Sequence, residues 1–383
     1  MGAALLLAPA VVSAQADTVP QVDIVDVIFR KRPSQPELYI GERFQATILP
    51  SVSYNPAFGV VFSMGGAGLV RLGTPDSTSL SSFSANASYT TKGQFLVTFR
   101  SNIFLPKDNW NFTGDWRYWN TSQPTYGLGP IHPESDRVDM DFKFIRVYEI
   151  AYKKIEQNLF AGLGFHLDNW FDIVEHGVTP GDTTPYGKWT GTSPDQEAAV
   201  GLSLNMLFDS RDNPLNPSRG VFMHVALREN AMLLGSDAHW NSARVEARGY
   251  PRLGPRTILG IWVLASFTGG HPPYFNLPAL GWDRDGRSGR GYTAGRIRGI
   301  DGNYAEFELR HTFTRNGLLG GVAFVNFTAT SDENESNRYS ASTGYGAGAR
   351  IKLNKKTGTN IAIDYGHGVE GSSGFFFAIN ETF

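Results

Sequence analysis

The chain contains no cysteine, few charged residues and no long apolar run. The absence of cysteine excludes disulfide bonds and thiolate metal sites. Charged residues make up 18% of the 383 residues, whereas a typical soluble protein has about 25%. A membrane-spanning helix needs ~20 consecutive apolar residues, and no such run follows the N-terminal region. A formal net charge of −2 gives no indication of a nucleic-acid partner.

What the chain does have is aromatic residues, at 13%, and 43 glycines. Few charges, many aromatics and no helix-length apolar run together are typical of β-strands with one apolar face. The N-terminus reads "MGAALLLAPAVVSAQADT", in which a short apolar core precedes the small-residue pattern Ala14-Gln15-Ala16. We therefore predict a signal peptide over residues 1–16, followed by a short periplasmic lead segment over residues 17–43.

From residue 44 to the end of the sequence, polar and apolar residues alternate in stretches of ~10 residues. In "NYAEFELRHTF", for example, Glu306, Glu308 and Arg310 fall on one face, and Phe307 and Leu309 on the other. The alternation predicts sixteen strands, at 44–54, 58–71, 82–91, 94–104, 110–118, 138–153, 157–168, 196–208, 220–231, 239–250, 256–268, 303–314, 318–329, 343–353, 359–366 and 374–383. Short turns such as "NKKTG" alternate with long connections, of which residues 269–302 form the longest.

These features predict an all-β fold, a single 16-stranded antiparallel transmembrane β-barrel over residues 44–383, with short turns on the periplasmic side. Closing the sheet pairs every backbone N–H and C=O, so that no edge meets lipid. A soluble β-sandwich would also show alternation. It would not need a signal peptide, sixteen strands, or a charged face opposite one rich in Phe, Tyr and Leu.

Three motifs resemble the BamA/TamA outer-membrane assembly and translocation superfamily, the bacterial surface antigen barrels. The first is the turn "LFDSRDNPLNPSRGVF", the second is "RIRGID" in the long connection, and the third is the final phenylalanine after alternating aromatics. The turn motif comprises Asp209, Arg211, Asp212, Asn213, Pro214, Pro217, Arg219 and Gly220. Residues 17–43 are too few for the periplasmic POTRA domains of that family, so the resemblance predicts a short form without them.

The resemblance implies that the long external loop folds into the lumen, where its arginine-bearing tip meets acids on the barrel wall. The tip here is Ile297-Arg298-Gly299-Ile300, in which Ile300 replaces the family's aromatic residue. We expect Arg298 to make a forked contact with Glu308, and Glu306 is the second choice. On the next strand Asn326 stands where the family has an aspartate, and Thr328 stands where it has a glycine. Asn326 can still accept a hydrogen bond.

The resemblance also places a weakly paired seam between the first and last strands. Pro50 favours this interpretation, because proline donates no ladder hydrogen bond and is confined to edges and bulges. At the other side of the seam, the last strand is expected to carry an outward aromatic face that doubles as the C-terminal insertion signal. Its residues are Phe375, Phe377, Ile379 and Phe383.

No residue pattern indicates an enzyme, a cofactor or a metal site. Asp209, Arg211 and Asp212 fit a turn held by a local ion pair better than a metal site. The pair Glu306 and Glu308 fits lumen electrostatics better than acid–base catalysis. The expected function is therefore insertion, assembly or translocation of outer-membrane proteins or lipoproteins, without covalent chemistry. Expected partners are outer-membrane lipids and other outer-membrane or periplasmic proteins; a passive channel or an accessory subunit of an envelope complex is the alternative.

Overall fold

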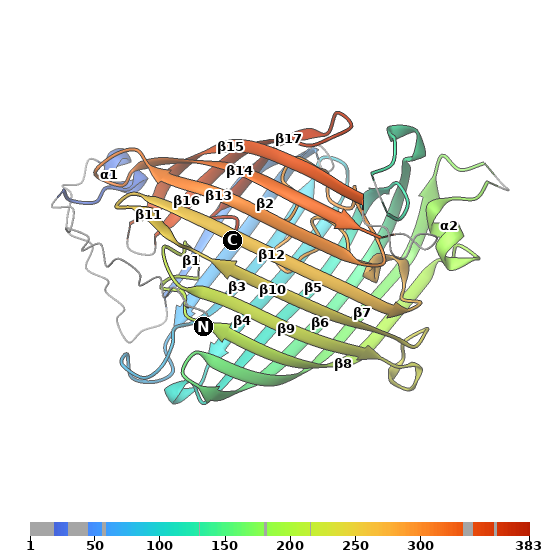
Figure 1. Cartoon of the computed structure of the whole chain (residues 1–383), viewed down its shortest axis with the longest axis horizontal. Helices are drawn as coiled ribbons and strands as arrows, with labels where there is room; N and C mark the ends of the chain where they lie inside the picture. Colours follow the sequence, from blue (N-terminus) through green and yellow to red (C-terminus); the bar gives the residue numbers. More distant parts are fainter. Residues whose placement is uncertain are drawn as a thin grey trace, which may run out of the picture.

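The chain forms one antiparallel sheet that is rolled into a barrel of strongly tilted strands (Figure 1). The computed structural model describes residues 19–29, 45–55, 59–129, 131–179, 182–214, 216–331, 340–355 and 358–383. The helices and strands are α1 (Ile24–Ile28), β1 (Gln45–Asn55), β2 (Gly59–Val70), β3 (Ser81–Thr90), β4 (Phe95–Phe104), β5 (Trp110–Thr125), β6 (Val138–Glu156), β7 (Leu159–His176), α2 (Pro185–Thr190), β8 (Gln196–Asp209), β9 (Val221–Asn230), β10 (Trp240–Gly249), β11 (Arg252–Gly254), β12 (Thr257–Gly270), β13 (Gly302–Thr312), β14 (Leu319–Thr330), β15 (Ser340–Asn354), β16 (Thr359–His367) and β17 (Ser373–Ile379).

The strands pair antiparallel with their neighbours in sequence, from β1 with β2 to β16 with β17. β11 has only three residues and pairs with β12 alone, while β10 reaches past it to pair with both β9 and β12. Apart from this short piece, the described residues form sixteen strands in one sheet. The predicted all-β, sixteen-stranded antiparallel barrel is therefore confirmed.

The two faces of the strands differ as the alternation predicts. On β8, Leu202, Leu204 and Met206 are exposed on the outer face, whereas Ser203 and Asn205 between them are buried. Side chains of opposite polarity can alternate in this way only because successive residues of a strand point to opposite faces. The apolar outer face suits lipid, and the polar inner face lines the lumen. No described helix is both long enough and apolar enough to cross a membrane.

Two strands extend well beyond their predicted ends. β5 continues to Thr125 and β7 to His176, although we expected them to end near residues 118 and 168. The added stretch of β5 reads "WNTSQPT", and after its tryptophan the polar residues and the proline resemble a loop. These residues nevertheless pair along β6, with Pro124 opposite Asp139. The longer strands build a collar on the loop side of the barrel.

The N-terminal helix α1 is fixed to the opposite, turn side of the barrel. Val22 N donates at 2.9 Å to Asn316 O, which lies in the turn after β13. Asp26 of α1 lies 2.6 Å from Nζ of Lys355, which follows β15. Asp23 caps the helix by accepting from Asp26 N at 3.0 Å. The predicted signal peptide, residues 1–16, and most of the lead segment, residues 17–43, lie outside the described residues.

The end of the sequence departs from its predicted position. β17 ends at Ile379, and Asn380 adopts a left-handed conformation with φ 76°. This conformation turns residues 380–383, here called the tail, into the lumen. Phe383 is therefore only 3% exposed, and the expectation that it shares the outer face of Phe375 and Phe377 is wrong.

Candidate functional site: the plugged lumen and the strand seam

The connection between β12 and β13, residues 271–301, fills the lumen from the loop side and is here called the plug loop. Its contacts reach strands far apart in the sheet. Trp282 Nε1 donates to Gln123 Oε1 on β5 at 2.9 Å, whereas Arg290 of the same loop lies 2.6 Å from Glu308 on β13. A loop that contacts opposite walls in this way lies inside the barrel. The external loop predicted to fold into the lumen is present.

An aromatic cluster holds the start of the plug loop against β6 and β7. Trp170 stacks on Phe144 with ring centroids 3.8 Å apart and on Phe275 of the plug loop at 4.8 Å. Trp189 of α2 donates its indole N–H to Pro272 O at 2.8 Å. The buried members of the cluster are Met140, Phe142, Phe144, Trp170, Ile173, Tyr186, Trp189, Tyr274, Phe275 and Leu277. This apolar layer separates the interior of the lumen from the loop side.

Deeper in the lumen, Arg290 of the plug loop binds three carboxylates of the barrel wall. Its guanidinium lies 2.6 Å from Glu308 and 2.7 Å from Asp364, and it also pairs with Glu306. Burial opposes a charge on this arginine, but the three carboxylates outweigh it and raise its pKa well above the usual value. Arg290 therefore stays cationic and fixes the plug loop to β13 and β16.

The carboxylates that receive Arg290 are shared with two further buried arginines. Arg310 Nε donates to Glu308 Oε1 at 2.7 Å. Arg350 of β15 pairs with Asp364 and, through its Nε, with Glu381 of the tail at 2.7 Å. Arg290, Arg310 and Arg350 thus link the plug loop, the wall and the tail in one network of alternating charge.

Arg298, the arginine we expected in this role, lies elsewhere. It is 1% exposed and donates Nη1 to two backbone carbonyls of the plug loop, Tyr274 O at 3.0 Å and Leu277 O at 3.4 Å. Its guanidinium also lies over the Tyr274 ring, 4.9 Å from the centroid. The predicted contacts from Arg298 to Glu308 and to Glu306 are therefore wrong.

The physical reason is the depth at which the tip lies. Arg298 forms an isolated β-bridge with Ala279, which holds the tip beside the aromatic cluster rather than beside the acids. Among the described residues no carboxylate forms an ion pair with Arg298, and burial lowers its pKa. The tip residue Ile297 is buried in a second apolar cluster, which includes Trp262 and Leu280. Ile300 packs against the aromatic cluster, and Gly299 N donates to Pro278 O at 3.0 Å. The tip therefore stabilises the plug loop through contacts within the loop and does not bind it to the acids of the wall.

Asn326 contacts the plug loop at Arg290. Its side-chain Nδ2 donates to the backbone carbonyl of Arg290 at 2.9 Å. It therefore acts as a donor, although we had expected an acceptor. The substitution of asparagine for aspartate leaves the charged network with Glu306, Glu308 and Asp364 as the acids facing Arg290, and it adds a backbone anchor at the same residue.

A charge-reversal experiment separates the two arginines. We expect Arg298→Glu to destabilise the barrel, and the added change Glu308→Arg to give no recovery, because the two side chains do not touch. The second change should instead add damage by placing a cation beside Arg290 and Arg310. The measurement is the midpoint of urea unfolding in detergent, monitored by the gel mobility of unboiled protein. Recovery in the double variant would contradict the observed arrangement.

The turn after β8 has the local structure that its sequence predicts. Arg211 and Asp209 form a two-pronged ion pair at 2.9 and 2.8 Å, and Asp212 accepts from Ser218 N at 2.9 Å. Gly220 has φ 98° and its added Cβ would lie 2.3 Å from a backbone oxygen, so this position needs glycine. The Arg219 side chain is mostly exposed.

One connection leads from this turn to the lumen. Pro217 O accepts from Arg310 Nη1 at 3.3 Å, so the turn reaches the charged network from below. Within the described residues no cluster of three or more His, Cys, Asp or Glu could hold a metal ion.

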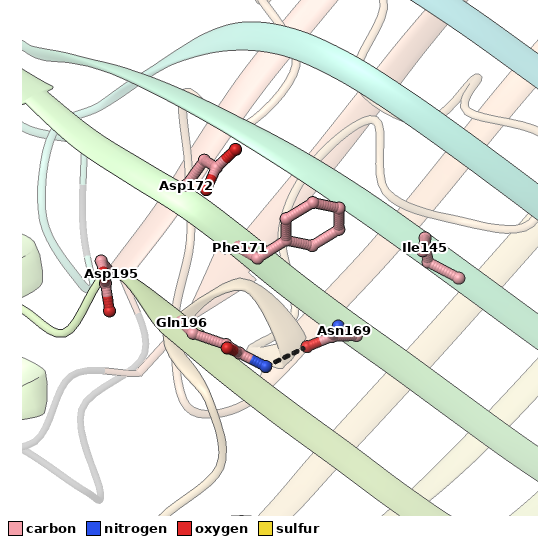
Figure 2. Close-up of a pocket in the computed structure, with 6 residues that line it drawn as sticks. All are labelled: Ile145, Asn169, Phe171, Asp172, Asp195 and Gln196. Carbon is pink, nitrogen blue, oxygen red and sulfur yellow. Dashed lines mark hydrogen bonds between the residues drawn. The ribbon is translucent and has the colours of Figure 1, made fainter.

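A separate hollow lies at the loop-side ends of β7 and β8, lined by Ile145, Asn169, Phe171, Asp172, Asp195 and Gln196 (Figure 2). Gln196 Nε2 donates to Asn169 Oδ1 at 3.1 Å across the two strands. Asp172 lies on β7 and Asp195 immediately precedes β8, and their carboxyl groups do not converge on a common point in Figure 2. Lys143 Nζ pairs with Asp172 at 2.6 Å. These residues make a polar patch with no nucleophile and base in contact.

The first and last strands form a seam. β1 and β17 lie close together, yet the strand ladders of the described residues join β1 only to β2 and β17 only to β16. β17 has seven residues and β1 has eleven. Pro50 is exposed near the middle of β1, and Phe375, Phe377 and Ile379 are exposed on the outer face of β17.

Four residues of the charged network in the lumen were not identified from the sequence: Arg290, Asp364, Arg350 and Glu381. Arg290 lies in "GRSGRGYTAGRIRG", where several arginines compete for the same role. Asp364 and Arg350 occupy lumen-facing positions of their strands and could have been found by listing every inward charge. Glu381 carried a clearer signal, because continued alternation would place it on the lipid-facing side with Ile379.

Together, the tilted antiparallel barrel, its apolar outer face and the plugged polar lumen define a β-barrel of the outer-membrane type. A family model described as the Omp85 superfamily domain matches residues 72–383. The chain therefore belongs to the Omp85 superfamily. A comparison with curated proteins found no match.

Solved structures with the same fold include two kinds of barrel. BamA from Haemophilus ducreyi lacking POTRA domains 1–3 has a TM-score of 0.57 and 14% identity, with 88% of this chain and 70% of that chain covered. CdiB from Acinetobacter baumannii has a TM-score of 0.56 and 13% identity, over 89% and 60%. CdiB from Escherichia coli gives 0.54 and 11%, over 91% and 63%. The chain spans less than two thirds of either CdiB chain, and identities this low bear on the fold alone.

Proposed function

We propose that this chain is an integral barrel of the bacterial outer membrane that helps to insert, assemble or translocate other proteins, without covalent chemistry. Membership of the Omp85 superfamily and the BamA-like and CdiB-like fold support the general role. The observation that carries the proposal is the seam, where β1 and β17 lie side by side with no ladder between them in the described residues.

A seam whose two strands are not joined by a ladder of hydrogen bonds can bind a strand of another protein. A strand edge presents unpaired N–H and C=O groups that can pair with a strand of another chain. β1 has such an edge, while its other side is bound to β2 along all eleven residues. Pro50 removes one donor from β1, which weakens any pairing that would seal the barrel. A client strand can therefore add at the seam while the rest of the sheet stays closed.

The plugged lumen argues against a passive channel as the main role. The plug loop is bound to the wall by buried ion pairs and by an aromatic cluster, so free diffusion of solutes through the centre is obstructed. The proposed partners are outer-membrane lipids around the apolar belt and client or accessory proteins. α1 supports an accessory contact, because Val27, Ile28 and Phe29 are all exposed beside the turns.

Cross-linking the seam tests the proposal. The chain has no cysteine, so cysteines can be introduced at Val52 and Phe375, or at Ile48 and Ile379, and joined by a flexible bismaleimide. In cells that depend on the variant, we expect the cross-linker to lower the amounts of a defined set of outer-membrane proteins, measured by proteomics of the membrane fraction.

The matched control joins two strands that are already paired. Met64 on β2 lies opposite Ala87 on β3, so the pair Met64→Cys and Ala87→Cys is joined without affecting the seam. Client levels should be unchanged in this control. If the seam cross-link also leaves all client proteins at normal levels, or if only solute uptake falls, seam-based handling of proteins is wrong.

A further inference from the structure

The tail is held in a pocket that has the features of a peptide-binding site. The pocket lies inside the barrel, and its walls come from the residue after β10, from β12, β13, β15 and β16, and from the plug loop. Glu381, Thr382 and Phe383 are each at least 93% buried there. Its apolar part receives the Phe383 ring, and its polar part binds the backbone and the carboxylate of the tail.

The apolar part is a slot for one aromatic ring. The Phe383 ring lies 5.4 Å from the Trp262 ring and 6.4 Å from the Tyr250 ring, measured between centroids. Arg310 lies over the same ring at 5.1 Å. Gly260 forms the floor, because a Cβ at this position would lie only 3.0 Å from the Phe383 ring. The slot is therefore shaped by the absence of a side chain on β12.

The polar part binds the backbone and the acid of the tail. Glu381 is held by Arg350 Nε at 2.7 Å and by Asn360 Nδ2 at 2.5 Å. Arg287 of the plug loop donates to Glu381 O and, at 3.0 Å, to Ile379 O. Arg310 Nη2 donates to Phe383 O at 2.7 Å. A segment with an acid two residues before an aromatic residue satisfies all of these groups.

The walls of the pocket are also supported by contacts that do not involve the tail. Arg310 is oriented by Glu308 and by Pro217 O, and Arg350 by Asp364. Trp262 Nε1 donates to Glu246 Oε1 at 3.1 Å. None of these contacts involves the tail, so the pocket is preorganised. A vacated pocket would leave buried guanidinium donors unpaired, which is costly, and this cost favours a replacement segment.

The tail also has an alternative place to go. β17 is four residues shorter than β1, and the tail consists of the four residues 380–383. If Asn380 left its left-handed conformation, the tail could extend β17 alongside β1. The pocket and the seam therefore compete for the same segment.

We propose that this pocket is an exchangeable binding site for an extended polypeptide segment of the pattern Glu-x-Phe. The tail is its intramolecular occupant, and a segment of another chain with the same pattern takes its place when the tail leaves. The site is defined by its own contacts and does not depend on the proposed seam function. If that function holds, the site supplies a second place for a client strand.

The test uses the full chain with a weakened tail. In the variant Glu381→Gln/Phe383→Ala the tail loses its acid and its ring, while the pocket walls are unchanged. The probe is a fluorescein-labelled peptide with the sequence of residues 377–383, and its binding to protein in detergent is measured by fluorescence anisotropy. We expect the variant to bind the peptide at least tenfold more tightly than the unaltered chain, whose own tail competes.

Two controls identify the site. Adding Gly260→Leu fills the slot and should abolish peptide binding, and a peptide with alanine at the last position should bind at least tenfold more weakly. Equal binding to the variant and the unaltered chain, or binding that survives Gly260→Leu, would overturn the proposal. If the double variant does not fold, as judged by the mobility of unboiled protein, Phe383→Ala alone serves as the receptor with the same expected results.

Discussion

Arg290→Ala is expected to lower the free energy of unfolding by about 3–5 kcal/mol, because removing one partner of a buried ion pair leaves an uncompensated charge. In this variant Glu308 is still paired with Arg310, and Asp364 is still paired with Arg350. Glu306 is left with the Tyr304 hydroxyl, which donates to it. The buried charge of Glu306 therefore accounts for most of the cost. The measurement is urea unfolding in detergent, monitored by tryptophan fluorescence.

The same change should release the middle of the plug loop. Arg290 connects this loop to β13 and to β16, whereas the buried residues that the loop gives to the aromatic cluster, Tyr274, Phe275 and Leu277, lie at its beginning. In planar bilayers we expect Arg290→Ala to show larger and more frequent conductance steps than the unaltered chain. Adding Glu306→Gln should recover part of the stability, because it removes the unpaired charge, but it should not restore the plug.

Arg284→Ala is the matched control. Arg284 lies on the same loop and its side chain is exposed. Arg100 and Arg117 donate to its backbone carbonyl, each at 2.7 Å, and this contact survives the change to alanine. The control should shift stability by about 0.5 kcal/mol or less. If Arg290→Ala behaves like this control, the ion-pair network does not hold the plug.

The barrel could be predicted from the sequence because its cause is local. A strand between lipid and water needs alternating side chains, and a window of about ten residues carries that pattern. A window of this length did not predict the strand ends that extend beyond the lipid-facing part of the barrel. The end of β5 lies in the collar, where no lipid face is required, and its residues "NTSQPT" show no apolar alternation.

The choice of arginine could not be predicted, because it depends on depth within the lumen. Arg290, Arg296 and Arg298 lie on the same glycine-rich loop, and each is buried. Which one meets Glu306 and Glu308 is decided by the β-bridge between Ala279 and Arg298, a pairing within the loop that no periodicity shows. The family resemblance identified the correct loop and the correct acids, but it assigned the wrong partner.

The inward tail was predictable in part. Phe375, Phe377 and Ile379 face outward, and continued alternation would place Glu381 and Phe383 on the same lipid-facing side. A carboxylate in that position is unfavourable, and this conflict indicated a break before residue 381. The direction of the break was not encoded locally, since it depends on Trp262 and Arg310, more than seventy positions earlier.

Trp170→Ala is expected to have the second large effect, a loss of about 3–5 kcal/mol in the free energy of unfolding. Trp170 is fully buried between Phe144 of β6 and Phe275 of the plug loop. Its indole N–H donates to Asn276, whose amide in turn donates to Asp168 at 2.8 Å. The change would open a cavity and would also leave the Asn276 oxygen without this donor.

Trp170→Ala tests whether the plug loop is held independently at its beginning and at Arg290. Trp170→Ala should loosen the loop beside the collar, so that added protease cleaves near residues 271–277 while Arg290 stays bound. Trp110→Ala is the control, since Trp110 is partly exposed on the outer face and should cost less with no new cleavage. Combined with Arg290→Ala, the two losses in the free energy of unfolding should add if the two attachments are independent. A combined loss well below the sum would show that the aromatic cluster and the ion pairs form one cooperative lock.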